Sequence, residues 1–296
     1  MKTYHDIASD GGSRILEQVS AQQERLTARL SSVRRIVAIA SGKGGVGKST
    51  LTAMLAAALG QQSCRVGILD ADLNGPSMAH MMGVRRHVPI PANGSVSPAL
   101  AANDVAVMSM DMFLPADSTP LLWRAPSQQN AFTWRSMVEM SALRELLSDT
   151  DWGKLDVLLI DLPPGSDRIQ NLADLLPDLS GVIIVTTPAA VAQMVVSRSI
   201  TLATDVAGLA VIGLVENMTS FACPVCSHQQ RLFPAAPDTR SLAEEHDLAY
   251  LGSIPFDSQL ARQLDHGRCF VSTSPDSPAS RAIFSVARSV HTRLNL

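Results

Sequence analysis

The stretch IVAIASGKGGVGKSTLTAMLAAALG, residues 36–60, decides the fold of this 296-residue chain. It begins with a short apolar and β-branched run at residues 36–40, which is typical of a buried strand. A glycine-rich turn follows, and residues 51–59 are then rich in alanine and leucine up to Gly60, as in a helix that ends at a glycine. The order strand, glycine loop and helix predicts the opening of an α/β fold.

The turn fits the phosphate-loop pattern G-x-x-x-x-G-K-[ST] in the strand-to-helix context that this pattern requires. Glycines let backbone N–H groups surround phosphate oxygens, and the helix N-terminus adds a positive potential. We expect Lys48 to reach the β- and γ-phosphates, Ser49 to ligate Mg²⁺ and Thr50 to lie near the α-phosphate. A glycine turn that only packs helix on strand is the alternative. The predicted nucleotide-binding loop consists of Gly42, Lys43, Gly44, Gly45, Val46, Gly47, Lys48, Ser49 and Thr50.

Aspartates follow two further apolar runs. Asp161 ends residues 157–160, so its carboxylate is expected at the carboxyl edge of the sheet, where it would ligate Mg²⁺. Asp70 and Asp72 end residues 66–69, and one of them is expected to orient the attacking water. An aspartate after a strand is otherwise a turn or helix-capping residue.

The rest of the chain continues the alternation of strands and helices. Because the apolar runs are continuous, they indicate strands that are covered on both faces. The pattern predicts a doubly wound, mainly parallel sheet in a domain over residues 34–296, preceded by a helical extension over residues 1–33. Strands are expected at 66–69, 105–108, 157–160, 182–185, 211–215 and 250–254, and helices at 13–33, near 130–148, 188–206, 258–265 and 278–294.

Composition excludes several classes of protein. Hydrophobic residues make up 46% and charged residues 17%, which is a globular balance rather than that of a disordered or fibrous chain. The formal net charge of −3 gives no reason to expect nucleic acid as a partner. The N-terminus does not resemble a secretory signal, and residues 281–294 favour a helix that covers the core over a membrane anchor. We expect a cytoplasmic protein without stable membrane association.

Cys223 and Cys226 form a Cys-x-x-Cys pair with the spacing of adjacent ligands to zinc or to an iron–sulfur cluster. Two thiolates do not complete a four-ligand site, so the others would come from a second subunit or, within one chain, from His228, Cys64 or Cys269. Spacing alone favours zinc. A redox-active or merely structural thiol pair is the third interpretation.

Lys43 and the following Gly-Gly-Val-Gly-Lys-Ser-Thr resemble the deviant Walker A motif of the ParA/MinD class of dimerising P-loop ATPases. Further motifs, in the same order along the chain, resemble the Mrp/ApbC family of iron–sulfur cluster carriers. These motifs are Asp70-Ala71-Asp72-Leu73-Asn74-Gly75-Pro76-Ser77, Trp123-Arg124, Trp152-Gly153-Lys154-Leu155-Asp156, Asp161-Leu162-Pro163-Pro164-Gly165, Glu216-Asn217-Met218 and Cys223-Pro224-Val225-Cys226.

The resemblance implies a weak, switch-type ATPase that uses ATP and Mg²⁺. Lys43 would contact the nucleotide of the opposite subunit, Lys48 would act on the phosphates, and Asp72 and Asp161 would be the two switch residues. Asn217 would contact the adenine and Pro255 would lie beside it. Cys223 and Cys226 would ligate a [4Fe-4S] cluster, with zinc as the alternative.

The implied function is a homodimer that assembles the cluster at its interface and transfers it to apoprotein clients. The alternative is a ParA/MinD-like regulatory ATPase whose cysteines hold a structural zinc or no metal. A reductase that passes electrons through a bridging cluster is disfavoured, because relatives of that type place their cysteines far apart. The chain also departs from the family pattern, with Ala125 and Ser127 after Trp123-Arg124, Arg168 after the Asp161 motif, and Cys269 in place of a proline.

Overall fold

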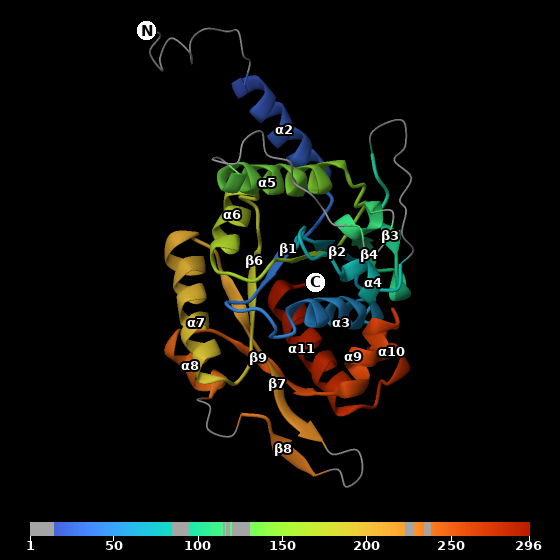
Figure 1. The fold of residues 1–296 in the computed structure, drawn as a ribbon, viewed down its shortest axis with the longest axis vertical. Coiled ribbons are helices and arrows are strands. Elements are labelled where there is room, and N and C mark those ends of the chain that lie inside the picture. The colour runs from blue at the N-terminus through green and yellow to red at the C-terminus, as the bar shows by residue number, and fades with distance from the viewer. Residues whose placement is uncertain are drawn as a thin grey trace.

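The computed structural model describes residues 15–84, 95–114, 116, 119, 131–222, 228–233 and 238–296. Strands and helices alternate along most of this length (Figure 1). The elements are α2 (Ile15–Leu30), β1 (Ile36–Ala40), α3 (Lys48–Gln61), β2 (Val66–Asp70), α4 (Met78–Met81), β3 (Ala99–Leu100), η1 (Ala102–Asp104), β4 (Ala106–Met108), η2 (Met110–Phe113), α5 (Ala131–Asp149), β5 (Val157–Asp161), α6 (Asp167–Leu175), β6 (Gly181–Thr186), α7 (Ala190–Thr201), η3 (Leu202–Val206), β7 (Val211–Ala222), β8 (Gln229–Arg231), α8 (Thr239–Glu245), β9 (Tyr250–Phe256), α9 (Ser258–Asp265), α10 (Phe270–Thr273) and α11 (Pro278–Leu294).

The strands of the described residues form one sheet of nine, in the order β3-β4-β2-β5-β1-β6-β7-β8, with β9 paired to β7. β1 lies between β5 and β6 and is parallel to both. The antiparallel pairs that the structure describes are β3 with β4 and β7 with β8. The predicted mainly parallel sheet is therefore confirmed. Because β1, β2, β5 and β7 run in the same direction, the loops that follow them lie at the same edge of the sheet.

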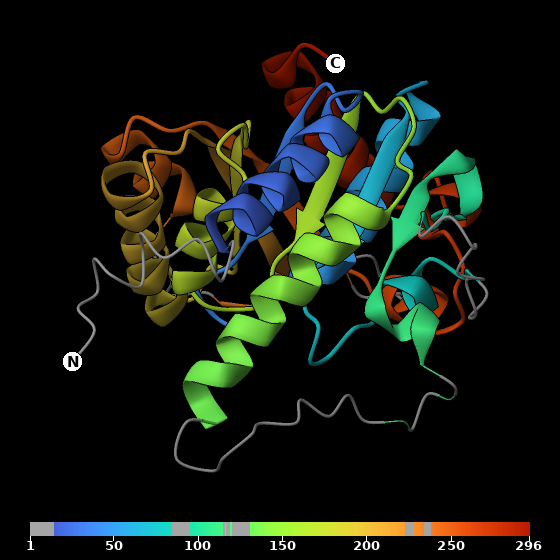
Figure 2. The same ribbon diagram turned by 90° about the horizontal axis from the view of Figure 1, so that it is seen from above.

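Helices cover both faces of the sheet, which creates two apolar cores (Figures 1 and 2). Alternate residues of β1 point to opposite faces, so Val37 and Ile39 enter one core while Ile36 and Ala38 enter the other. The first core is closed by α3, α9, α10 and α11, and the second by α2, α5, α6, α7 and α8. Burial on both faces explains why the strands read as continuous apolar runs.

The ends of the chain pack onto these cores. Leu26 and Leu30 of α2 are buried in the second core, where α2 lies beside α5 (Figure 2). The division into an extension of residues 1–33 and a domain of residues 34–296 stays a prediction. Apolar residues of α11, among them Ile283 and Val290, are buried against α3 and β9, so this helix covers the core as predicted. Among the described residues, no helix combines the length and apolar character that crossing a membrane requires.

Several elements differ from the sequence-based expectation. The strand expected at 211–215 continues to Ala222, because its outer part pairs with β8 in a hairpin. α7 ends at Thr201, and the chain goes on as a π-helical turn over Leu202–Val206. The nine-residue α6 and seven-residue α8 were not expected, because segments this short show too few apolar repeats to establish a helical period.

Candidate nucleotide site

The loop between β1 and α3 has the backbone of a phosphate-binding loop. Gly45 and Gly47 both have φ of +81°, a left-handed conformation that side chains disfavour. α3 begins directly after Gly47 at Lys48, so free backbone N–H groups at the helix start point toward the loop. Val46 is buried and anchors the loop, whereas Lys43 is exposed. An exposed Lys43 is free to reach a group outside its own chain.

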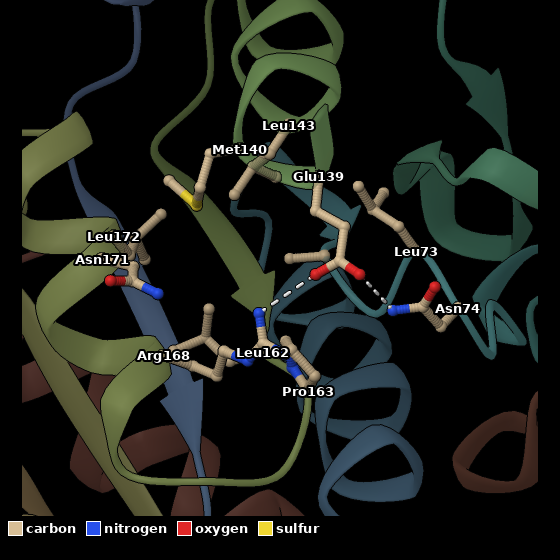
Figure 3. Close-up of a pocket in the computed structure, with 11 residues that line it drawn as sticks. Leu73, Asn74, Glu139, Met140, Leu143, Leu162, Pro163, Arg168, Asn171 and Leu172 are labelled. Atoms are coloured by element: carbon tan, nitrogen blue, oxygen red, sulfur yellow. Dashed lines mark hydrogen bonds and ion pairs between the residues drawn. The ribbon is translucent and has the colours of Figure 1, made fainter. Parts of the chain in front are cut away.

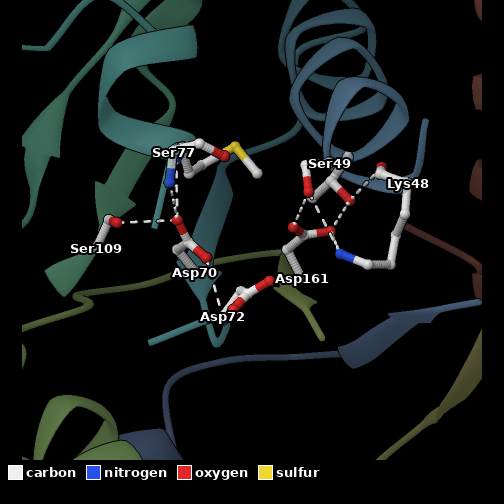
Figure 4. Close-up of polar contacts among 9 residues, drawn as sticks. Lys48, Ser49, Asp70, Asp72, Ser77, Ser109 and Asp161 are labelled. Carbon is white, nitrogen blue, oxygen red and sulfur yellow. Dashed lines mark hydrogen bonds and ion pairs between the residues drawn. The ribbon is translucent and has the colours of Figure 1, made fainter. Parts of the chain in front are cut away.

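Lys48, Ser49 and Asp161 meet at the carboxyl edge of the sheet (Figure 4). The Nζ atom of Lys48 lies 2.9 Å from Oδ1 of Asp161. The hydroxyl of Ser49 donates to Oδ2 of Asp161 at 2.6 Å. Lys48 is 7% exposed and Asp161 is 1% exposed, so the two charges are shielded from water and depend on each other. The predicted association of the loop with an aspartate at the end of β5 is present in the structure.

The chemistry of this donor set fits a nucleotide with Mg²⁺. The Ser49 hydroxyl and the Asp161 carboxylate supply neighbouring oxygens, which are the ligands that Mg²⁺ prefers. Lys48 brings a cation to the same place as the helix start. When bound, Mg²⁺ would offset the charge of the phosphates. These residues together provide a cradle for a polyanion.

Asp70 and Asp72 have different roles in the structure, although the sequence placed them together. Asp70 is 1% exposed, and its Oδ2 accepts the N–H groups of Ser77 and Met78 and the hydroxyl of Ser109. Burial, together with the charge of Asp161, raises the pKa of Asp70 to about 7. Asp72 is half-buried, and its carboxylate accepts the N–H of Gly75. Asp70 thus ties the far end of the loop that carries Asp72, where α4 (Met78–Met81) begins, back to the end of β2.

Asn217 contacts the phosphate loop itself. Its Nδ2 atom donates to the carbonyl oxygen of Val46 at 2.9 Å, and the residue is 7% exposed. In the register of β7 with β9, Asn217 lies opposite Ile254, the neighbour of Pro255. Asn217 and Pro255 therefore lie on adjacent strands, with Asn217 bonded to the loop, and their predicted contacts with adenine stay predictions.

The hydrogen-bond partners of two polar residues around the site, Thr52 and Glu216, were not predicted from the sequence. Thr52, one turn after Lys48 on α3, donates to Oδ1 of Asp161 at 2.7 Å and completes the partners of this carboxylate. Glu216 is buried beside Asn217, and it accepts hydrogen bonds from Thr239 and Tyr250. In the sequence, the available signals for these contacts were a threonine in an apolar helix and a glutamate in an apolar strand. Neither identifies its partner, because the partners lie far away in sequence.

The predicted cluster ligands Cys223 and Cys226, like Trp123, lie outside the described residues. Trp152, in contrast, is buried, and its Nε1 donates to the carbonyl of Leu147. In the part of the chain that is described, no group of three or more His, Cys, Asp or Glu side chains has an arrangement that would hold a metal ion. Cys64 and Cys269 are half-buried against the first core.

Replacing Gly47 by alanine is expected to destabilise the protein more than the same change at Gly45. Both residues share φ of +81°, so each substitution costs about 1 kcal/mol for the backbone conformation. A Cβ at Gly47 would also lie 2.3 Å from Nδ2 of Asn217, whereas a Cβ at Gly45 would meet nothing within 4 Å. Urea denaturation of the two variants measures the difference. Equal midpoints would show that Asn217 does not crowd the loop.

Three features together define a P-loop NTPase. A phosphate loop follows the central strand, a buried lysine begins the next helix, and an aspartate ends the neighbouring strand. The family model described as ParA, NUBPL iron-transfer P-loop NTPase, matches residues 32–291. The chain therefore belongs to this family. The fold predicted from the sequence and the resemblance to iron–sulfur carriers are both confirmed.

Similar proteins support the same assignment. The chain is 34% identical over 278 residues to an iron–sulfur cluster carrier protein of Saccharolobus solfataricus, covering 94% of this chain and 90% of the relative. It is 37% identical over 270 residues to the cytosolic Fe-S cluster assembly factor NBP35 of Eremothecium gossypii, covering 90% and 78%.

Solved structures agree with the fold. A nucleotide-binding protein of Archaeoglobus fulgidus, in complex with ADP, has a TM-score of 0.68 and 34% identity, covering 83% of this chain and 92% of that one. The septum site-determining protein MinD of Pyrococcus horikoshii has a TM-score of 0.58 and 22% identity, covering 86% and 95%. The second likeness concerns the fold alone.

Proposed function

We propose that the protein is an ATP-binding, slowly hydrolysing carrier of iron–sulfur clusters. It assembles a [4Fe-4S] cluster on Cys223 and Cys226 at the interface of a homodimer and transfers the cluster to apoproteins. The names of the relatives from S. solfataricus and E. gossypii support this role, and the name of the second supports a cytosolic location. The cluster is cargo, so transfer is an exchange of cysteine thiolates on its irons.

The main support for the proposal comes from the path of β7, which contacts the phosphate loop and ends next to Cys223 in the sequence. Near its middle, Asn217 is bonded to Val46 of the phosphate loop. The adjacent Met218 has φ of +58°, which is unusual for a residue with a side chain. The strand then runs to Ala222, one residue before Cys223. A change in the loop on binding or hydrolysis of ATP therefore has a short, continuous route to the cysteines.

Other features fit a homodimer that is controlled by nucleotide. Lys43 is exposed at the loop and is available to the nucleotide of a second subunit, as the family resemblance implies. Cys223 and Cys226 of two chains together provide four thiolates, which is the number that a [4Fe-4S] cluster takes. Asp72 and Asp161 would sense the γ-phosphate and Mg²⁺, and hydrolysis would release their loops.

A transfer assay tests the proposal. The protein is loaded with cluster without oxygen, separated from free iron and sulfide, and mixed with an apoenzyme that is active only with a [4Fe-4S] cluster. We expect the enzyme to become active even when an iron chelator is present, because the cluster passes directly between thiolates. If the chelator prevents the enzyme from becoming active, the carrier role is contradicted. Tightly bound zinc with no cluster would instead support a regulatory ATPase.

A further inference from the structure

A buried carboxylate outside the nucleotide site lies between the two loops that carry Asp72 and Asp161. This carboxylate belongs to Glu139 of α5, which is 8% exposed. Oε1 of Glu139 accepts a hydrogen bond from Nδ2 of Asn74 at 2.9 Å. Oε2 accepts one from a guanidinium nitrogen of Arg168 at 3.3 Å. Figure 3 shows Glu139 reaching down from α5 with one partner on each side.

The two partners belong to the two predicted switch segments. Asn74 lies two residues after Asp72, in the loop that follows β2. Arg168 lies in the first turn of α6, seven residues after Asp161 at the end of β5. β2 and β5 are neighbouring parallel strands, and the N–H of Ala71 donates to the carbonyl of Asp161 at 2.9 Å. The loops thus leave the sheet side by side, and Glu139 joins them further out.

The hydrogen bonds of Glu139 with Asn74 and Arg168, which together form the Glu139 junction, lie in apolar surroundings. The small cavity beside Glu139 has apolar walls that include Leu73, Leu143 and Leu162 (Figure 3). A carboxylate in such surroundings is costly unless charged or polar donors satisfy it. Arg168 is 31% exposed and also lies 3.7 Å from the exposed Asp167, so it has a second, more hydrated partner when it leaves Glu139. Arg168 therefore keeps a charged partner when it leaves Glu139, whereas the buried carboxylate of Glu139 loses its charged donor.

We propose that Glu139 is a positioning residue that couples the Asp72 loop to the Asp161 loop through Asn74 and Arg168. It touches neither the phosphate loop nor the Lys48–Asp161 pair. Its effect is to make the two loops order and relax together instead of separately. The inference adds to the proposed ATPase switch and does not depend on the cluster.

Hydrogen–deuterium exchange of the full-length protein tests the coupling without ATP hydrolysis or iron. Arg168→Ala removes the donor on α6 only. We expect it to speed amide exchange about tenfold or more at residues 71–77 as well as 162–170, because local opening of one loop is no longer resisted through the other. Glu139→Gln, which keeps the shape of the side chain, should have the same effect. Glu145→Gln, an exposed change on the same helix, is the control and should leave both loops unchanged.

The double variant separates coupling from local damage. If both side chains act through one junction, Arg168→Ala adds nothing to the exchange of residues 71–77 once Glu139→Gln is present. Acceleration confined to residues 162–170 in Arg168→Ala would overturn the proposal, and so would additive effects in the double variant. ATP turnover gives a second readout, in which we expect kcat to fall while ADP affinity stays within about twofold of wild type. Failure of cluster transfer in the wild-type protein would refute the carrier role and leave the exchange result standing.

Discussion

Replacing Lys48 by alanine is expected to weaken the binding of ATP and ADP by about 100-fold. The phosphates lose a buried cation whose charge-assisted hydrogen bonds contribute about 1.5–3 kcal/mol each. The same change leaves Asp161 without its ion-pair partner, although the hydroxyls of Ser49 and Thr52 still donate to it. Breaking a buried pair on one side costs about 3 kcal/mol of stability, so the variant should also unfold at lower denaturant concentration.

Isothermal titration calorimetry on folded protein measures the loss, with circular dichroism as the check on folding. Lys154→Ala is the matched control, because this lysine is exposed and should keep wild-type affinity. Lys48→Met keeps much of the length of the apolar stem and serves as a second variant if alanine prevents folding. A folded variant at Lys48 whose affinity lies within threefold of wild type would refute the assignment of the phosphate loop.

Cys223→Ala and Cys226→Ala are each expected to abolish retention of the iron–sulfur cluster and to leave ATP binding intact. A cluster that loses one cysteine from each subunit keeps only two thiolate ligands, and is then open to solvent and easily lost. The nucleotide site should be unaffected, because its contact with β7 is made by Asn217, upstream of both cysteines. Absorbance near 400 nm after reconstitution and gel filtration follows the cluster.

Cys64→Ala and Cys269→Ala provide controls with the same loss of a thiol. Both residues are half-buried against the first core, and the Cys269 sulfur accepts a hydrogen bond from Ser272. Cys64 precedes β2, at the amino edge of the sheet, whereas β7 ends at Ala222 at the carboxyl edge, one residue before Cys223 in the sequence. We expect both controls to keep the cluster. A cluster that survives in the variants at Cys223 and Cys226 would disprove the ligand assignment.

Much of the fold was predictable because the local patterns of apolar residues in the sequence match the residues that are buried in the structure. Residues 36–40 and 157–160 are continuous apolar runs, and both become strands that are covered on two faces. The phosphate loop was recognisable because few sequences other than glycine-rich ones permit φ of +81° at two positions so close together. Asp161 was identified because it ends a strand, and the sheet register then brings it to Ser49.

The remaining features depend on contacts that no local pattern specifies. Glu139 looks like an ordinary helix glutamate in the sequence, and its role depends on Asn74 and Arg168, which lie 65 and 29 residues away. The hydrogen bond from Asn217 to Val46 spans 171 residues. The inner part of β7 was predictable from apolar residues, but its extension to Ala222 depends on pairing with β8. Long-range polar pairs therefore account for most of what the sequence did not reveal.

The most direct test of the carrier role is chemical analysis of the protein after anaerobic reconstitution with iron and sulfide, with zinc measured in the same samples. The carrier role predicts about four irons and four sulfides for every two chains, together with dimers in solution. Tightly bound zinc without sulfide would contradict it, and would show that the cysteines hold a structural metal in a regulatory ATPase.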